Sequence, residues 1–282
     1  MSPMQQPSDS KSAADGAKIP VIGFGTGGKM RENCAAIVAT ALTLGYRHID
    51  TARNYGSETA VGQAMRASGI PRREIFLTTK IKHEDLRPRD VERSAETSLK
   101  ELGVDWIDLL LVHWPNPAVL LAETMPALAG LKRQGIARHI GVANFTVALL
   151  DEAIRCCPEP LAANQVEYHA HIDQSKVLAA CRRLGLILIA HCPLRRGRLL
   201  DDPVLGEIAR AKNKSPAQIA LRWLIQQDNV VAIPASSNPE RVAENLDLFD
   251  FSLSDVEMAR IAARKRPDGR VAKPARSPVW DT

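Results

Sequence analysis

Four side chains with complementary acid–base chemistry stand at or just beyond the ends of short apolar runs. Asp50 ends the run HID, and Tyr55 lies five residues beyond it. Lys80 ends the run LTTK, and His113 ends the run LLLVH. A phenol with a pKa of about 10 is a poor acid–base group at neutral pH, but a neighbouring ammonium group lowers that pKa. A carboxylate can hold the ammonium in place, and a neutral imidazole can donate a hydrogen bond to a carbonyl oxygen.

These groups suit the reduction of a carbonyl, which places a hydride on carbon and a proton on oxygen. Tyr55 is then expected to donate the proton, with Lys80 adjusting its pKa. Asp50 would anchor Lys80, and His113 would orient the substrate. Taken singly, each residue has an ordinary structural explanation, because lysines at strand ends are commonly solvated and single histidines are commonly structural. The prediction therefore requires that all four side chains meet at one place.

Short apolar runs alternate with longer amphipathic runs along the whole chain. The predicted strands cover residues 20–25, 46–50, 75–80, 107–112, 139–143, 162–166, 186–190 and 230–233. The predicted helices cover residues 31–44, 57–68, 88–102, 119–134, 146–156, 175–184, 215–227 and 238–246. Eight strand–helix units without a linker favour an α/β fold, a single (β/α)8 barrel over residues 18–282, in which all strand ends face one mouth. Residues 253–282 would add one more helix and a short C-terminal extension.

A glycine-rich segment offers a competing interpretation. Residues 23–28, GFGTGG, match the G-x-G-x-x-G pattern of dinucleotide-binding sheets, and Asp50 lies 22 residues beyond, where such folds place a ribose-binding acid. An open doubly wound sheet also alternates strands and helices, so periodicity does not decide between the two folds. The polar segment TARNYG after Asp50 has no special role in that fold. We therefore expect a tight turn at a barrel mouth, near a ligand.

The composition is typical of a globular protein. Of the 282 residues, 45% are apolar and 24% are charged, and no apolar run is long enough to span a membrane. The net charge of +5 could suit nucleic acid, but the Lys and Arg residues are dispersed. We therefore expect neither a nucleic-acid partner nor a membrane partner. The first 17 residues are small and polar, which predicts a disordered tail over residues 1–17.

The cysteines and histidines indicate neither a disulfide framework nor a metal site. Five scattered cysteines form no C-x-x-C pair, which favours a reducing, cytoplasmic setting. His169 and His171 lie two residues apart, but no third ligand stands at metal-binding spacing. We expect no metal ion, and we expect the protein to be a monomer.

Longer motifs resemble those of the aldo-keto reductase family. They are GYRHIDTA (45–52) with Tyr55-Gly56, GVANF (141–145), NQVEYH (164–169), and IPASSNPER (233–241) with Glu244 and Asn245. The resemblance covers about residues 19–282. Within the family, the short loop after Trp114 and the ending GRV…PVWD are most similar to bacterial 2,5-diketo-D-gluconate reductases of the B type.

The resemblance implies reduction of a small carbonyl substrate by NADPH, with Tyr55 as the proton donor. Asn144 and Gln165 would hold the nicotinamide carboxamide, which suits amide side chains that both donate and accept hydrogen bonds. Arg241 and nearby hydroxyls would hold the adenosine phosphate, because guanidinium groups bind phosphates strongly. The full implied set of NADPH/NADP+ residues is Gly25, Thr26, Asn144, Gln165, His191, Pro193, Leu194, Ser236, Ser237, Arg241, Glu244 and Asn245.

Four positions depart from the family pattern. Ala143 replaces a serine beside Asn144, which removes one contact to the carboxamide. His191 replaces a tyrosine that stacks on the nicotinamide, and imidazole offers a smaller flat surface. Ala235 stands where many members carry a lysine for the 2′-phosphate, so the selectivity for NADPH should be weaker. Gly27 stands where many members carry a tryptophan, so the substrate mouth should be wider.

Two alternatives stay open. The basic segment LRRGR at residues 194–198 is either a solvated loop or a phosphate-binding loop beside the cofactor pyrophosphate. The chain is either an active reductase or a nicotinamide-binding regulatory or inactive barrel, because channel-associated barrels of this kind keep much of the catalytic set. Steady oxidation of NADPH with an aldehyde would separate the active enzyme from the other two.

Overall fold

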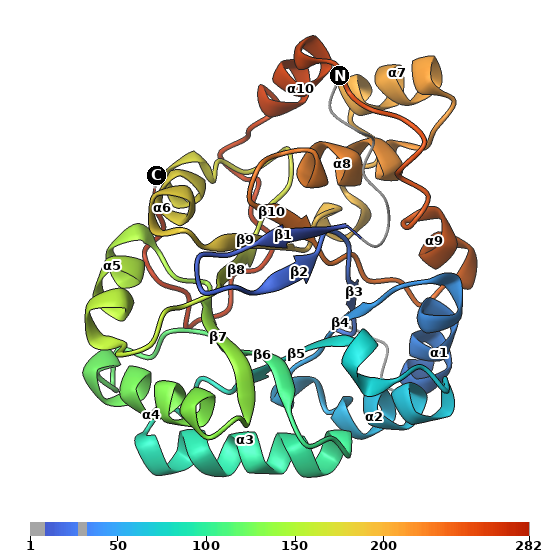
Figure 1. The fold of residues 1–282 in the computed structure, drawn as a ribbon. Coiled ribbons are helices and arrows are strands. Elements are labelled where there is room, and N and C mark those ends of the chain that lie inside the picture. The colour runs from blue at the N-terminus through green and yellow to red at the C-terminus, as the bar shows by residue number, and fades with distance from the viewer. Residues whose placement is uncertain (1–8, 28–32, 282) are drawn as a thin grey trace.

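Eight parallel strands form one sheet within residues 9–27 and 33–281, which are the residues that the computed structural model describes. In chain order these strands are β3 (Phe24–Gly25), β4 (His48–Asp50), β5 (Phe76–Ile81), β6 (Ile107–Val112), β7 (Ala137–Ala143), β8 (Ala163–Glu167), β9 (Ile187–His191) and β10 (Val230–Ala232). An isolated parallel bridge between Ile22 and Ala232 joins the chain just before β3 to β10, so the sheet closes into a barrel (Figure 1). The predicted (β/α)8 fold is confirmed.

Helices surround the barrel (Figure 1). They are α1 (Cys34–Leu44), α2 (Glu58–Ala67), α3 (Pro88–Leu102), α4 (Leu121–Arg133), α5 (Val147–Cys156), α6 (Ser175–Leu184), α7 (Pro203–Lys212), α8 (Pro216–Ile225), α9 (Pro239–Glu244) and α10 (Asp255–Ala262), with short turns η2 (Arg53–Tyr55), η3 (Arg72–Glu74) and η4 (Arg195–Gly197). The sequence patterns did not predict α7. Its signal is Asp202, which caps the helix by accepting hydrogen bonds from the amides of Val204 and Leu205.

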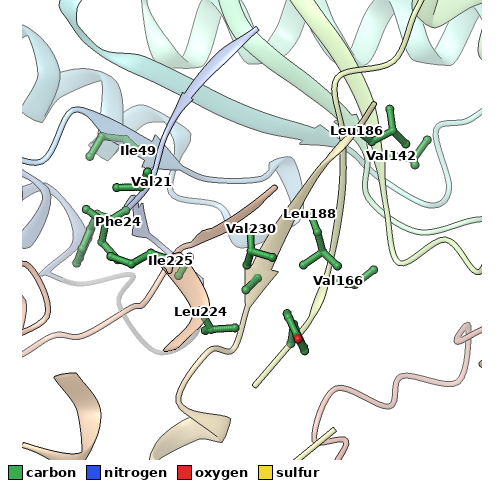
Figure 2. Close-up of a cluster of buried hydrophobic side chains, with 14 of the residues drawn as sticks. Val21, Phe24, Ile49, Val142, Val166, Leu186, Leu188, Leu224, Ile225 and Val230 are labelled. Atoms are coloured by element: carbon green, nitrogen blue, oxygen red, sulfur yellow. The ribbon is translucent and has the colours of Figure 1, made fainter. Parts of the chain in front are cut away.

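Alternation along each strand separates two apolar layers. Leu109 and Leu111 of β6 belong to the layer inside the barrel, whereas Val112 joins the layer beneath the helices. This separation follows from the two-residue period of a strand. Figure 2 shows part of the outer layer, in which Leu224 of α8 and Val230 of β10 contribute side chains to one cluster. Burial on both faces explains why the strand sequences are continuous apolar runs.

A short hairpin closes the N-terminal end of the barrel. Strand β1 (Ser10–Ser12) pairs antiparallel with β2 (Lys18–Pro20), and Figure 1 shows both strands lying across the ring. Ile19 is fully buried among the interior side chains. The prediction of a disordered tail is therefore wrong for residues 9–17, because strand β1 pairs with β2 and the small side chains of Ala13 and Ala17 are buried in the same cluster. Residues 1–8 lie outside the described residues.

The glycine-rich segment belongs to the barrel wall. A Cβ on Gly23 would lie 2.6 Å from the Nδ1 of His48, so only glycine lets the imidazole ring pack at this point. Gly25 pairs with Asp50 in the register between β3 and β4. Gly28, the last glycine of the pattern, lies outside the described residues. The closed sheet excludes the open doubly wound alternative.

We expect Ile19→Ala to lower the free energy of unfolding by about 2–5 kcal/mol, because it leaves a cavity in the plugged barrel end. Val256→Ala is the control. It removes a side chain that is 70% exposed, and should change the free energy of unfolding by less than about 0.5 kcal/mol. Urea denaturation measures both effects. Two equally small changes would show that the hairpin does not contribute to closing the barrel.

Candidate active site

A buried ion pair forms the centre of the candidate site. The Nζ of Lys80 donates to the Oδ1 of Asp50 at 2.5 Å and to the carbonyl oxygen of Thr51 at 2.8 Å. Neither Lys80 nor Asp50 is more than 2% exposed. A buried charge is costly unless it is paired, so each of these two groups fixes the position of the other.

Tyr55 reaches this pair from a short turn. It ends η2, and Gly56 follows with a φ of 65°, a left-handed conformation that glycine adopts readily. The Nζ of Lys80 lies 5.2 Å from the centroid of the Tyr55 ring. The rings of Tyr55 and His113 meet edge to face, with centroids 5.6 Å apart. Four side chains thus lie together at the C-terminal ends of the strands. They are Asp50, Tyr55, Lys80 and His113, and we call them the tetrad.

Glu58 fixes the turn that carries Tyr55, although the sequence patterns did not select it. Its side chain is fully buried, accepts a hydrogen bond from the Oγ1 of Thr79 at 2.6 Å and pairs with Arg53 at 3.1 Å. Thr79 precedes Lys80, and Arg53 lies in the same turn as Tyr55. Glu58 therefore ties the position of the phenol to that of the ammonium. Its signal in the sequence is an acidic residue three positions after Tyr55.

Burial and charge act in opposite directions on the pKa of Tyr55. Burial raises the pKa of the Tyr55 phenol above its usual value, and the Lys80 ammonium offsets only part of that rise. The net direction is therefore opposite to the lowering that the sequence suggested, because desolvation of a phenolate outweighs one nearby cation. Burial by itself lowers the pKa of Lys80, but Asp50 and Tyr55 overcome this effect and the pKa is raised. At neutral pH the phenol is protonated and the ammonium is charged.

Two histidines at the mouth are neutral at neutral pH. Burial lowers the pKa of His113 well below its ordinary value, and the charge of Lys80 adds to that effect. Burial likewise lowers the pKa of His191, to about 4. A neutral imidazole can still donate one hydrogen bond, and it does not repel a nearby cation.

Two amide side chains that the sequence assigned to a nicotinamide lie against the tetrad. Asn144 follows β7 with a φ of 63°, a conformation that asparagine tolerates better than most residues. Its Nδ2 donates to the carbonyl oxygen of His113 at 2.9 Å, and its Oδ1 lies 3.1 Å from the Nε2 of His191. The Nε2 of Gln165, on β8, donates to the Oδ2 of Asp50 at 2.7 Å. These amides connect the tetrad to the next strands around the barrel.

The predicted phosphate-binding residues lie after β10 and on α9. Ser236 and Ser237 precede the helix, and Asn238 caps it by accepting hydrogen bonds from two first-turn amides. Arg241 is exposed, and its guanidinium has no ion-pair partner among the described residues. Two hydroxyls and an uncompensated cation on one rim suit a phosphate ester. The other residues assigned to a cofactor are Glu244 and Asn245 at the end of α9, and Gly25, Thr26, His191, Pro193 and Leu194 at the strand ends.

The basic segment at residues 194–198 divides into two parts. Arg195 is buried, and its guanidinium donates to the carbonyl oxygens of Asp268 and Gly269 at 2.7 and 2.9 Å. Arg195 therefore holds the C-terminal segment. The sequence suggested either a solvated loop or a phosphate-binding loop, and neither describes Arg195. Arg196 and Arg198 are exposed and stay candidates for a phosphate contact.

Glu167 holds the same C-terminal segment from β8. Its carboxylate accepts hydrogen bonds from the amides of Val271 and Ala272 at 2.7 and 2.8 Å, and lies 3.0 Å from the Nε2 of His169. Burial raises the pKa of Glu167, but these hydrogen bonds reverse that effect, and the pKa falls to about 2. His169, whose spacing from His171 raised the question of a metal site, therefore contacts the carboxylate that holds the C-terminal segment.

The part of the chain that the structure describes contains no group of three or more His, Cys, Asp or Glu side chains arranged to hold a metal ion. No helix in that part combines the length and the apolar composition needed to cross a membrane.

A separate apolar groove of about 320 Å³ includes Tyr168, Trp223 and Met258 in its lining. This groove contains no residue of the tetrad, so we place the candidate site at the strand ends.

Most of the chain matches one protein family. A model of the Aldo/keto reductase family matches residues 21–265. The chain is 39% identical over 266 residues to the methylglyoxal reductase DkgB of Salmonella typhimurium. This alignment covers 93% of this chain and 99% of the relative. It is 41% identical over 264 residues to the morphine 6-dehydrogenase of Pseudomonas putida, and this alignment covers 88% of each chain.

Solved structures share the fold over nearly the whole chain. One that carries the provisional name 2,5-diketo-D-gluconic acid reductase B has a TM-score of 0.93 and 41% identity, covering 98% of this chain and 99% of that chain. An aldo-keto reductase of Bombyx mori, solved in complex with NADP, has a TM-score of 0.85 and 34% identity, covering 93% of both chains. The first structure confirms the similarity to B-type diketogluconate reductases that the sequence indicated.

Removing the Lys80 charge should raise the pKa of His113. In Lys80→Met we expect His113 to become protonated at higher pH, because the Lys80 ammonium lowers the pKa of His113 in the unmutated protein. Lys132→Met, on α4, is the matched control and should leave the pKa of His113 unchanged. Nitrogen NMR of the imidazoles through a pH titration measures both. If His113 titrates identically in Lys80→Met and in the unmutated protein, the two groups are not electrostatically coupled.

Proposed function

This chain belongs to the aldo/keto reductase family, and on that premise we propose that it reduces a small carbonyl compound to an alcohol with NADPH. The observation that carries the proposal is the tetrad. A protonated phenol, a charged ammonium with its carboxylate, and a neutral imidazole meet at one mouth of the barrel. Reduction of a carbonyl requires a proton for the oxygen, and a phenol beside an ammonium can supply it.

Tyr55 is the proton donor in this proposal. Burial raises its pKa, so the phenol keeps its proton at neutral pH until a stronger base forms beside it. The Lys80 charge, 5.2 Å from the ring centroid, stabilises the phenolate that remains after transfer. Asp50 keeps that charge in place, and the raised pKa of Lys80 keeps the ammonium protonated throughout.

His113 orients the substrate. Its imidazole is neutral and packs against the Tyr55 ring, so both side chains can aim a donor at the same carbonyl oxygen. Donors that are already in place stabilise the negative charge that develops on this oxygen during reduction. The Lys80 ammonium adds a favourable field without itself giving up a proton.

The donor set beside the tetrad fits a dinucleotide. When bound, NADPH supplies the hydride. Asn144 and Gln165 present amide groups that are complementary to a carboxamide. His191 is neutral, so its flat ring could stack on a nicotinamide without repelling the positive ring of the oxidised cofactor. Ala143 is fully buried and offers no hydroxyl, so the hydrogen bonds to the carboxamide come from the two amides.

Arg241 supports a preference for NADPH over NADH. Its exposed guanidinium has no ion-pair partner among the described residues and shares a rim with Ser236 and Ser237. A guanidinium binds a phosphate through two parallel hydrogen bonds, whereas a lysine acts more as a point charge. Because Ala235 replaces the lysine common in the family, we propose that the preference is weaker than in members with both cations.

The substrate in this proposal is a small polar carbonyl compound, such as methylglyoxal or a sugar-derived diketo acid. Relatives named for such substrates support it. The loop between β6 and α4, which contains Trp114, is short and offers little surface to a steroid. A panel of kcat/KM values for methylglyoxal, a diketo acid and a steroid ketone tests the substrate class. A morphinan ketone belongs in the same panel, because one relative is named a morphine 6-dehydrogenase.

We further propose that the protein works as a monomer in the cytoplasm. Its five cysteines are free, which suits a reducing compartment. The four side chains of the tetrad meet within one barrel, which supports a monomer.

Tyr55→Phe should lower kcat for methylglyoxal by about 10²–10⁴-fold, because the ring stays in place while the proton donor is lost. Binding of NADPH, followed by its fluorescence, should change much less. Tyr168→Phe is a matched control, since the Tyr168 hydroxyl bonds Gln227 at 2.8 Å outside the tetrad, and it should keep kcat. An unchanged kcat in Tyr55→Phe would mean that another group donates the proton.

Arg241→Ala should weaken NADPH binding by about 10–150-fold, the factor expected for one charge-assisted contact, and should leave NADH binding nearly unchanged. Isothermal titration of both cofactors against both proteins measures the four affinities. Equal losses for the two cofactors would show that Arg241 does not contact the 2′-phosphate. Tighter binding of NADH than of NADPH to the unmutated protein would contradict the cofactor preference itself.

A further inference from the structure

The C-terminal segment is fixed at both ends beside the mouth of the barrel. Glu167 and Arg195 hold residues 268–272 through backbone hydrogen bonds. Near the chain end, the Oδ2 of Asp281 accepts a hydrogen bond from the amide of Val147 at 2.9 Å, at the start of α5. The residues between these two anchors therefore have a defined course over the barrel.

This segment places two arginines against a pair of indole rings. Trp114 directly follows His113 and packs edge to face with Trp280, with ring centroids 6.2 Å apart. The guanidinium of Arg270 lies 3.5 Å from the centroid of the Trp280 ring, and that of Arg276 lies 5.7 Å from the Trp114 ring. Guanidinium groups stack favourably on aromatic faces. The result is an indole pair, flanked by two cations, that begins one residue from the tetrad.

Both guanidiniums have donors that the described residues leave unused. The Nη1 of Arg270 and the Nε of Arg276 are buried without a hydrogen-bond partner, and neither arginine forms an ion pair with a described carboxylate. Burial lowers the pKa of Arg270 to about 10, and the charge of Glu167 offsets only part of that effect. Buried donors are normally satisfied, so an unsatisfied donor on each of two guanidiniums beside the mouth points to a ligand with acceptor oxygens.

The charge of Arg276 acts on His113. After burial, Lys80 and His191, the Arg276 charge is a further cause that lowers the pKa of His113. In the proposed reaction His113 contacts the substrate carbonyl, so an anion on Arg276 would belong to the same small molecule. Trp114 links the two, since it follows His113 in the chain and its buried ring contacts Arg276.

We propose that Arg276, supported by Arg270, binds the carboxylate of an aldehyde acid or keto acid whose carbonyl is reduced at Tyr55. This inference rests on the proposed reductase function and specifies its substrate class. A guanidinium binds a carboxylate through charge-assisted hydrogen bonds, and the anion compensates cations that no described side chain pairs with. The two indole rings hold the guanidiniums in place beside the mouth.

Two aldehydes of equal size test the anion site. With NADPH, kcat/KM for 4-carboxybenzaldehyde should exceed that for the neutral 4-formylbenzamide. Arg276→Gln should remove this preference by raising KM for the acid about 10–150-fold, with a much smaller effect on kcat. Arg276→Lys should keep part of the preference, since it keeps the positive charge but loses the planar guanidinium that donates two parallel hydrogen bonds. Lys273→Gln is the matched control, because Lys273 is an exposed cation on the same segment, and it should keep the preference intact.

The outcomes separate this inference from the proposed function. If both aldehydes are reduced but Arg276→Gln affects them equally, the anion site is overturned and the reductase function stands. If neither aldehyde is reduced, the reductase function fails, and calorimetric titration with benzoate and benzamide decides the anion site alone. Tighter binding of benzoate that is lost in Arg276→Gln supports the site, and equal binding of the two compounds overturns it.

Discussion

A buried lysine stays charged only beside a carboxylate, and the contact between Lys80 and Asp50 is the interaction on which the rest of the site depends. The parallel register of β4 and β5 brings the two strand ends side by side. Gln165 donates to the second carboxylate oxygen, and the Thr51 carbonyl accepts from the ammonium. Loss of either charge would leave the other buried without a partner. The pair must therefore stay in contact, and this restricts every group that touches it to one geometry.

The same cation determines the protonation of its neighbours. It adds to burial in lowering the pKa of His113, and it opposes burial at Tyr55 without reversing it. At neutral pH the site therefore presents two neutral donors beside one positive charge. Such an arrangement favours negative charge on a substrate oxygen, because the donors need no rearrangement as that charge develops. A charged imidazole would instead be repelled by the Lys80 ammonium.

The two ends of the barrel differ in what could be predicted of them. Strand and helix periodicity marked every barrel strand, because a covered parallel sheet needs continuous apolar runs. The strands of the hairpin, β1 and β2, have the sequences SKS and KIP, so neither is a continuous apolar run. The burial of the hairpin comes from contact with interior residues such as Leu109 and Ile187, which lie far along the chain. Helix α7 was missed as well, although its cap at Asp202 could have indicated it.

The sequence by itself determined the α/β alternation, the barrel, the family and the four residue types at the strand ends, since a barrel brings all its strand ends to one mouth. The tertiary structure decided how those groups behave. The pKa of Tyr55 rises because burial depends on everything packed around it. Arg195 holds the C-terminal segment because its carbonyl partners are 73 and 74 residues away. Desolvation and long-range hydrogen bonds arise only when distant segments meet, and no local pattern of residues encodes where that happens.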